Sequence, residues 1–163
     1  MTKPSGYVEA IYTAREAKQP MQEQDMAMLL QGRGVAGDRY GENVGSFSAR
    51  NDKIRHVSLI AIEAVWLANE SMEQPYDPAE TRRNILTSGI PDLRELVGVH
   101  FKIGEAVLRG DKVAGPCKFP EIYTGKPGFN DAYATREDSA YGGIRAEVLE
   151  SGIIAVGNSI EVI

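Results

Sequence analysis

The sequence contains a single cysteine, Cys117, and only two histidines, His56 and His100. One cysteine excludes an intrachain disulfide framework and any zinc site that is built from several thiolates. Three such residues are also too few for a zinc or iron centre held by protein ligands alone. A metal that arrives inside its own organic ligand would need just one thiolate, so this kind of centre stays open.

Long apolar segments and a positive net charge are also missing. No run approaches the ~18 apolar residues of a membrane span, and the first ten residues, MTKPSGYVEA, lack an apolar stretch of signal-peptide length. Eighteen Lys and Arg against 23 Asp and Glu leave a net charge of −5, which does not favour non-specific attraction to nucleic acid or anionic membrane. We therefore expect a cytoplasmic protein whose partners are neither nucleic acid nor membrane, and any basic site must be local.

What is present fits one ordinary domain. The 163 residues match the ~150 of a typical domain, and 42% hydrophobic with 25% charged residues are typical of a globular chain, so residues 1–163 are expected to form a single domain. The 17 glycines lie between short apolar runs, which indicates many tight turns.

Short β-strands dominate the predicted secondary structure. Ala61–Met72 is the best helix candidate, Pro91–Val97 holds one or two helical turns, and the type of Met26–Leu30 stays open. Three sites with a glycine beside a polar residue, Gly104-Glu105, Ser151-Gly152 and Gly157-Asn158, predict tight antiparallel connections. Strands are expected over Tyr7–Thr13, Lys53–Ile60, 81–90, Val99–Ile103, Ala106–Leu108, Ile144–Leu149, Ile153–Val156 and Ser159–Ile163. This pattern predicts a mainly β fold, a barrel or sandwich with a few short helices, and argues against a doubly wound sheet.

The glycine-rich loop around GRGVAG spells GxGxxG but does not predict a dinucleotide site. The polar segment DRYGENVGS follows it where the fingerprint needs an amphipathic helix. Asp38 and Arg39 in this bent loop are candidates to face a ligand, and the alternative is ordinary surface-turn chemistry.

Cys117 lies in AGPCKFP, where Gly115, Pro116 and Pro120 disfavour a helix interior and a central strand. The cysteine is therefore predicted in a constrained loop, where Lys118 could help stabilise a thiolate. A nucleophile or a soft-metal ligand is one interpretation, and a packed small hydrophobe is the other.

The segment TRRNIL supplies a second cluster. Strand alternation would place Arg82 and Asn84 on one face and Arg83 on the other. A guanidinium and an amide on one face can hold a phosphate or the edge of a heterocycle, whereas the alternative is an ordinary charged strand edge. His56 is read as a packed or hydrogen-bonded histidine, and no nucleophile elbow surrounds Ser48 or Ser58, which excludes a typical serine hydrolase.

Taken in order, several segments resemble the MOSC domain family, which is named from the C-terminal domain of molybdenum cofactor sulfurases. These segments are KPSGYVEAIY, GVAGDRY, RHVSLIAIEAV, TRRNILTSGIPDLRELVGVHFKIGEAVL, AGPCKFP and GIRAEVLESGIIAVGNSIEV. The resemblance covers nearly the whole chain and is most specific in the RxN segment, the single PC and the terminal GxIxxGxxIxV. Asn158 departs from the acidic residue common in the last hairpin, and the N-terminal extension of larger members is absent.

The resemblance implies a β-barrel-like MOSC fold and binding of the molybdenum cofactor, a molybdopterin whose phosphate needs cations. Cys117 then falls on the family position taken to ligate molybdenum or carry sulfur, and Arg82 and Asn84 fall on positions that contact the cofactor. Pyridoxal phosphate is a second ligand that the resemblance leaves open.

Two functions follow from the resemblance. One is a reductase of N-hydroxylated small molecules that works with a separate electron-donor reductase, because the sequence shows no flavin, haem or iron–sulfur motif. The other is a cofactor or sulfur carrier, with a persulfide on Cys117, that works with a cofactor-delivery protein.

Overall fold

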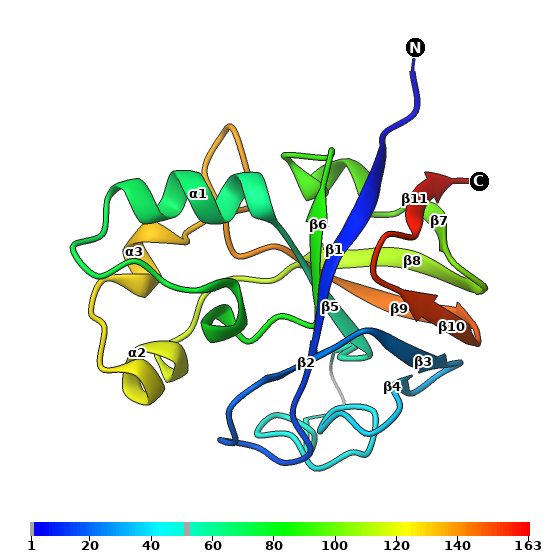
Figure 1. Ribbon diagram of the computed structural model, residues 1–163, viewed down its shortest axis with the longest axis horizontal. Coiled ribbons are helices and arrows are strands. Elements are labelled where there is room, and N and C mark those ends of the chain that lie inside the picture. Colours follow the sequence, from blue (N-terminus) through cyan, green and yellow to red (C-terminus); the bar gives the residue numbers. More distant parts are fainter. Residues whose placement is uncertain (1, 51–52) are drawn as a thin grey trace.

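A closed β-barrel forms the body of the molecule in the computed structural model, which describes residues 2–50 and 53–163 (Figure 1). Around the ring the seven strands are β1 (Ser5–Thr13), β6 (Ile85–Ser88), β5 (Val57–Ala61), β9 (Ile144–Glu150), β8 (Ala106–Val113), β7 (His100–Ile103) and β11 (Ser159–Val162). Strand β11 pairs with β1 and closes the ring. β5 and β6 run parallel, and the other ring pairs are antiparallel. The prediction of a mainly β, barrel-like fold is confirmed.

Alternation along each strand fills the barrel with apolar side chains. On β9, Ile144, Ala146 and Val148 are buried, whereas Arg145 and Glu147 between them are partly exposed. The period of two therefore directs every second residue of this strand to the interior and the others to the outer face. Large core residues such as Phe101 on β7 come from the same inward positions.

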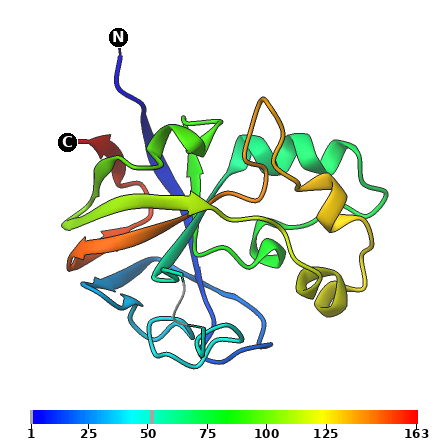
Figure 2. The ribbon, with the colours of Figure 1, turned by 180° about the vertical axis from the view of Figure 1, so that it is seen from behind.

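A small second sheet and several short helices lie outside the ring. β10 (Gly152–Ala155), β3 (Met26–Leu30) and β4 (Gly34–Val35) form the second sheet, and β2 (Gln22–Gln24) extends β1. The helices are α1 (Ile62–Glu70), α2 (Phe119–Thr124), α3 (Phe129–Ala132) and the 3₁₀ turns η1 (Pro78–Thr81) and η2 (Leu93–Leu96). Figures 1 and 2 show α1, α2 and α3 together on one side of the barrel.

The main helix was predicted within two residues of each end. Two of the three predicted tight connections are wrong, because β10 pairs with β3 rather than β9, and β11 pairs with β7 and β1 rather than β10. Gly152 is needed for a different reason: a Cβ there would collide with the backbone of Glu105 and Ala106. Glycine can mark a close backbone approach as well as a turn, and the sequence does not distinguish the two.

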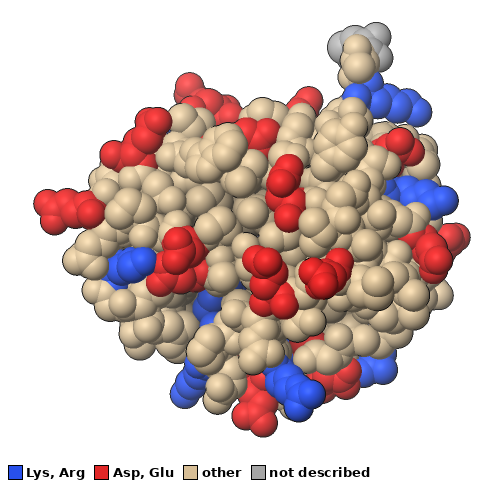
Figure 3. Space-filling view, viewed as in Figure 1, with Lys and Arg blue, Asp and Glu red and all other residues tan. Residues whose placement is uncertain are grey.

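Acidic side chains are spread over the face seen in Figure 3 without forming one continuous patch. Within the described ranges, no helix is long and apolar enough to cross a membrane.

The strand predicted from Lys53 begins only at Val57, so His56 lies just before β5 rather than within it, and it is hydrogen-bonded as expected. Its Nδ1 accepts a hydrogen bond from the backbone N–H of Val148 at 3.0 Å. Burial lowers the pKa of His56, although Glu147 and Asp111 oppose the shift. A protonated ring could not accept from Val148, so the folded state favours the neutral form.

Stability is therefore expected to fall as the pH drops below the unfolded-state pKa of about 6.5, because the unfolded chain then binds the proton more readily. The melting temperature between pH 7.5 and 5.5 measures this effect. His56→Gln, which keeps an acceptor but does not titrate, should flatten that dependence, and the exposed His100→Gln should not. Equal slopes in both variants would contradict the assignment.

Candidate functional site

A pocket of about 220 Å³ lies against the outer face of the barrel rather than inside it. Ser58 on β5 and Arg145 on β9 are register partners, so their side chains share one face of the sheet. That face is opposite to the one carrying Ile144 and Ala146, which are buried in the barrel core. The remaining walls come from the loop that follows β4, from the segment after η1, and from the segment around Cys117 with α2.

The pocket is strongly cationic although the chain is acidic. No carboxylate belongs to the part of its lining that residues 2–50 and 53–163 supply. Its cationic residues are Arg39, Arg50, Lys53, Arg55, Arg82, Arg83 and Arg145. Because the net charge is −5, any basic site for an anion had to be local, and this pocket is such a site.

Cys117 lines this pocket, in the segment between β8 and α2, and is partly exposed. Arg83 holds the start of that segment: its guanidinium donates to the carbonyls of Gly142 at 2.8 Å and of Ala114 and Gly115 at 3.2 Å each. Burial and the positive charge of Arg145 lower the pKa of Arg83 to about 10, which leaves it charged at neutral pH. A charged donor thus positions the loop that carries Cys117.

The strand predicted through Arg82, Arg83 and Asn84 does not begin until Ile85. A capping box of Asp77 and Glu80 starts η1, which ends at Arg82 in a left-handed conformation with φ 64°. This single helical turn displaces the start of the strand. Alternation therefore does not apply here, and the prediction that Arg83 faces away from Arg82 and Asn84 is wrong, because all three line the pocket.

Arg82 points its guanidinium along the pocket wall formed by α2. Its carbon Cζ lies 4.8 Å from the centroid of the Tyr123 ring, and its Nη1 donates to the carbonyl of Gln19. Burial and the nearby charge of Arg39 lower the pKa of Arg82, although Tyr123, Tyr40 and Asp38 oppose the shift, so two cations lie close together here.

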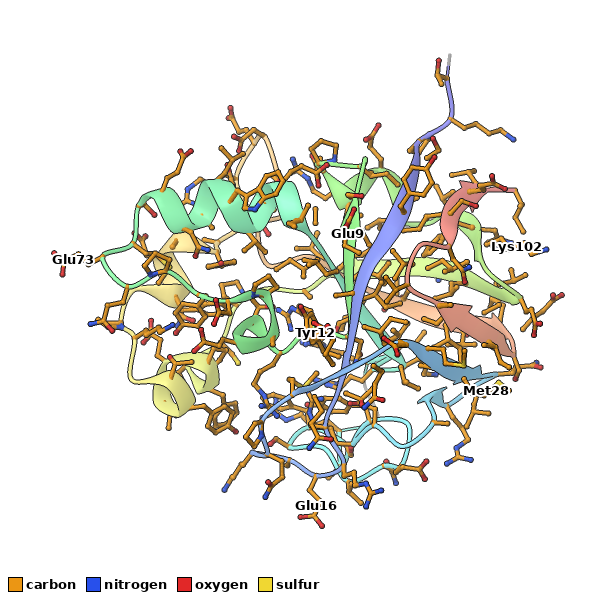
Figure 4. All side chains as sticks on the ribbon, in the orientation of Figure 1. Glu9, Tyr12, Glu16, Met28, Glu73 and Lys102 are labelled. Atoms are coloured by element: carbon orange, nitrogen blue, oxygen red, sulfur yellow. The ribbon has the colours of Figure 1, made fainter. Side chains whose placement is uncertain are left out.

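Asn84 is buried and joins three strands. Its Oδ1 accepts from the N–H of Ser58 at 3.1 Å, and its Nδ2 donates to the carbonyl of Tyr12 at 3.1 Å. Tyr12 lies on β1, near the middle of the view in Figure 4. The amide thus positions the junction of β1, β5 and β6, and one N–H of its Nδ2 remains for the pocket.

Asp38 and Arg39 are buried, but only Arg39 lines the pocket. Asp38 Oδ1 accepts from the N–H of Ala14 at 3.0 Å and from Arg39 Nη1 at 3.1 Å. Arg39 also lies 4.9 Å over the Tyr40 ring. The carboxylate of Asp38 is therefore a positioning group for Arg39 rather than a ligand-facing one, which revises its predicted role.

Three aromatic rings form a row along the pocket wall. The centroids of Phe47 and Phe119 lie 5.7 Å apart, and those of Phe119 and Tyr123 lie 6.0 Å apart in stacked orientation. Arg55 lies 5.3 Å over the Phe47 ring at one end, and Arg82 lies over Tyr123 at the other. Such a row offers flat apolar surface between two cationic ends.

The comparison with family models agrees with this arrangement. The model of the MOSC domain matches residues 46–161, which is more than half of the chain. The protein belongs to the MOSC domain family. This is a family associated with molybdenum cofactor binding. A search of curated proteins found no match.

Solved structures of stand-alone bacterial MOSC proteins share the fold. YuaD from Bacillus subtilis is 24% identical, with a TM-score of 0.77, and the match covers 97% of this chain and 95% of that one. YiiM from Geobacillus stearothermophilus is 14% identical, with a TM-score of 0.72, over 97% of this chain and 75% of that one. YiiM from Escherichia coli is 19% identical, with a TM-score of 0.68, over 97% and 69%.

Sequence reasoning missed Arg55, Arg145 and the aromatic row of this MOSC domain. Arg145 could have been placed on the outer face, because it alternates with the apolar Ile144 and Ala146 within a predicted strand. Arg55 and Phe47 come from an irregular loop, for which no periodicity predicts a direction.

Proposed function

We propose that this MOSC domain binds the molybdenum cofactor in the cationic pocket, with Cys117 as the protein ligand of the metal. The observation that carries the proposal is that the single cysteine shares one pocket with seven cationic side chains. The donor set suits the group: a soft sulfur for a dithiolene-bound metal and guanidinium groups for a phosphate.

Each residue has a role in this proposal. Arg82, with Arg39 beside it, holds the cofactor phosphate through charge-assisted hydrogen bonds, and the free N–H of Asn84 adds a neighbouring one. The aromatic row supports the flat heterocycle, and Arg83 keeps the Cys117 loop in place. When bound, the cofactor supplies a metal that exchanges two electrons and accepts oxygen.

The reaction we propose is the reduction of an N-hydroxylated small molecule. The N–O bond breaks, two electrons and two protons are consumed, and an amine and one water molecule form. A separate reductase that carries a flavin or iron–sulfur group supplies the electrons. The pocket cations favour anionic or electron-rich substrates, and the partly exposed Cys117 supports access from solvent.

Metal analysis of gently purified protein, followed by an assay with an N-hydroxylated base and a chemical reductant, tests this function. We expect about one molybdenum per chain together with formation of the amine. Bound molybdenum without turnover would contradict the reductase activity. Protein that takes up no cofactor from a cofactor-loaded donor protein would contradict both the cofactor binding and the reductase activity.

The second candidate is a carrier that holds sulfur on Cys117 as a persulfide. The pocket favours it because Arg83 and Arg145 line the pocket together with Cys117, and a persulfide anion would lie among these cations. Cyanide treatment would convert the outer sulfur to thiocyanate and leave the thiol. Thiocyanate release without reductase activity would select this candidate.

A further inference from the structure

The cations of the pocket fall into two groups at opposite ends of the aromatic row. Arg82 stacks on Tyr123 with Arg39 nearby, whereas Arg55 stacks on Phe47. Arg145 belongs with Arg55, since the charge of Arg55 is the main electrostatic influence on it after burial. The row of three rings runs between Arg82 and Arg55, so the two groups contact different rings of the row.

The second group, Arg55 and Arg145, is not neutralised by the protein. Arg55 Nε and Nη1 are buried without a hydrogen-bond partner. No hydrogen bond or ion pair to another described residue engages the Arg145 guanidinium, and no described carboxylate lines this pocket. Burying unpaired donors beside a like charge costs free energy, which a bound anion would recover.

The position of this pair relative to the sulfur is also informative. Arg145 and Cys117 line the same pocket, and the charge of Cys117 acts on the Arg145 guanidinium. The Arg145 guanidinium therefore lies within electrostatic reach of the sulfur. An anionic group bound there would lie beside the proposed reaction centre.

We infer that Arg55 and Arg145 form a second anion subsite that holds a phosphate group of the substrate, separate from the Arg39 and Arg82 end that holds the cofactor phosphate. The inference rests on the proposed function, because the subsite belongs to the substrate only if the cofactor occupies the Arg39 and Arg82 end of the pocket. It narrows the substrate to a phosphate-bearing small molecule. Two guanidinium groups suit phosphate because each presents paired donors to its oxygens.

Titration of inorganic phosphate into the cofactor-loaded protein, at constant ionic strength, tests the subsite. We expect one phosphate per chain to bind and to raise the melting temperature. Arg145→Gln and Arg55→Gln should each weaken binding about ten-fold or more while cofactor content stays unchanged. Arg109→Gln removes the same charge from an exposed cation paired with Asp111 and Glu147, and should leave binding unchanged.

Thermal stability is a second readout. Neither substitution removes a hydrogen bond within the described chain, and each relieves repulsion between two cations, so Arg145→Gln should melt at or above the wild-type temperature. Arg55→Gln also loses the contact with the Phe47 ring and should melt close to the wild-type temperature.

The outcomes separate this inference from the proposed function. Loss of cofactor in Arg145→Gln would overturn the inference, because the pair would then serve the cofactor phosphate, and absence of phosphate binding would overturn it too. If the protein binds no cofactor at all, the proposed function fails, and the subsite is tested in the Arg82→Ala variant without cofactor. Phosphate that still binds there, and is lost on adding Arg145→Gln, would support the subsite by itself.

Discussion

Replacing Cys117 with serine should abolish molybdenum binding and reductase activity while leaving the fold intact. Serine keeps the size and the hydrogen-bonding capacity of the side chain but removes the soft sulfur that a dithiolene-bound metal needs. The side chain is partly exposed, and the backbone of its loop is held by Arg83, so little packing depends on the sulfur. Loss of a ligand should lower activity about 100-fold or more, whereas the melting temperature should move by no more than about 2 °C.

Metal content, N-hydroxylated base reduction and thermal unfolding of the same preparation measure the three quantities. Cys117→Ala serves as the matched variant, because a cysteine that acts only by packing would tolerate alanine and serine differently, whereas a sulfur ligand is lost equally in both. A serine variant that unfolds at a much lower temperature but stays fully active would show that Cys117 is a packing residue instead.

Arg82→Ala and Arg83→Ala should fail in different ways. The Arg82 side chain donates one hydrogen bond within the described chain, to the carbonyl of Gln19, and stacks on Tyr123, so alanine should reduce cofactor content severely with little loss of stability. Arg83 donates to three carbonyls around Cys117, so alanine should lower the free energy of unfolding by about 2–3 kcal/mol. For a chain of this size that corresponds to a melting temperature lower by about 5–10 °C.

Cofactor content and calorimetric unfolding of both variants distinguish the two roles, with Arg109→Ala as the exposed-charge control. The expected pattern is a cofactor-poor but stable Arg82→Ala and a destabilised Arg83→Ala. Equal melting temperatures with full cofactor in Arg82→Ala would show that the phosphate is held elsewhere in the pocket.

The candidate site could be assembled from the sequence only in part. Cys117, Arg39, Arg82 and Asn84 were each singled out, and all four line one pocket. The reasons for two of them were wrong, since Arg82 and Asn84 do not project from one strand face. Asp38 was placed toward a ligand, but its carboxylate is buried against Ala14 and Arg39.

The sequence alone determined the secondary-structure class, the acidic net charge, the single cysteine and the constrained loop around Cys117. These are local properties: alternation, helix propensity, proline geometry and residue counts depend on neighbours along the chain. The order of the strands, the departure of β10 to a second sheet and the meeting of Arg55, Arg145 and Cys117 at one pocket were decided only by the tertiary structure. The reason is physical, because barrel closure joins segments such as 55–58, 81–84 and 145 through long-range pairings, and the free energy of those pairings comes from the packed core as a whole rather than from any one segment.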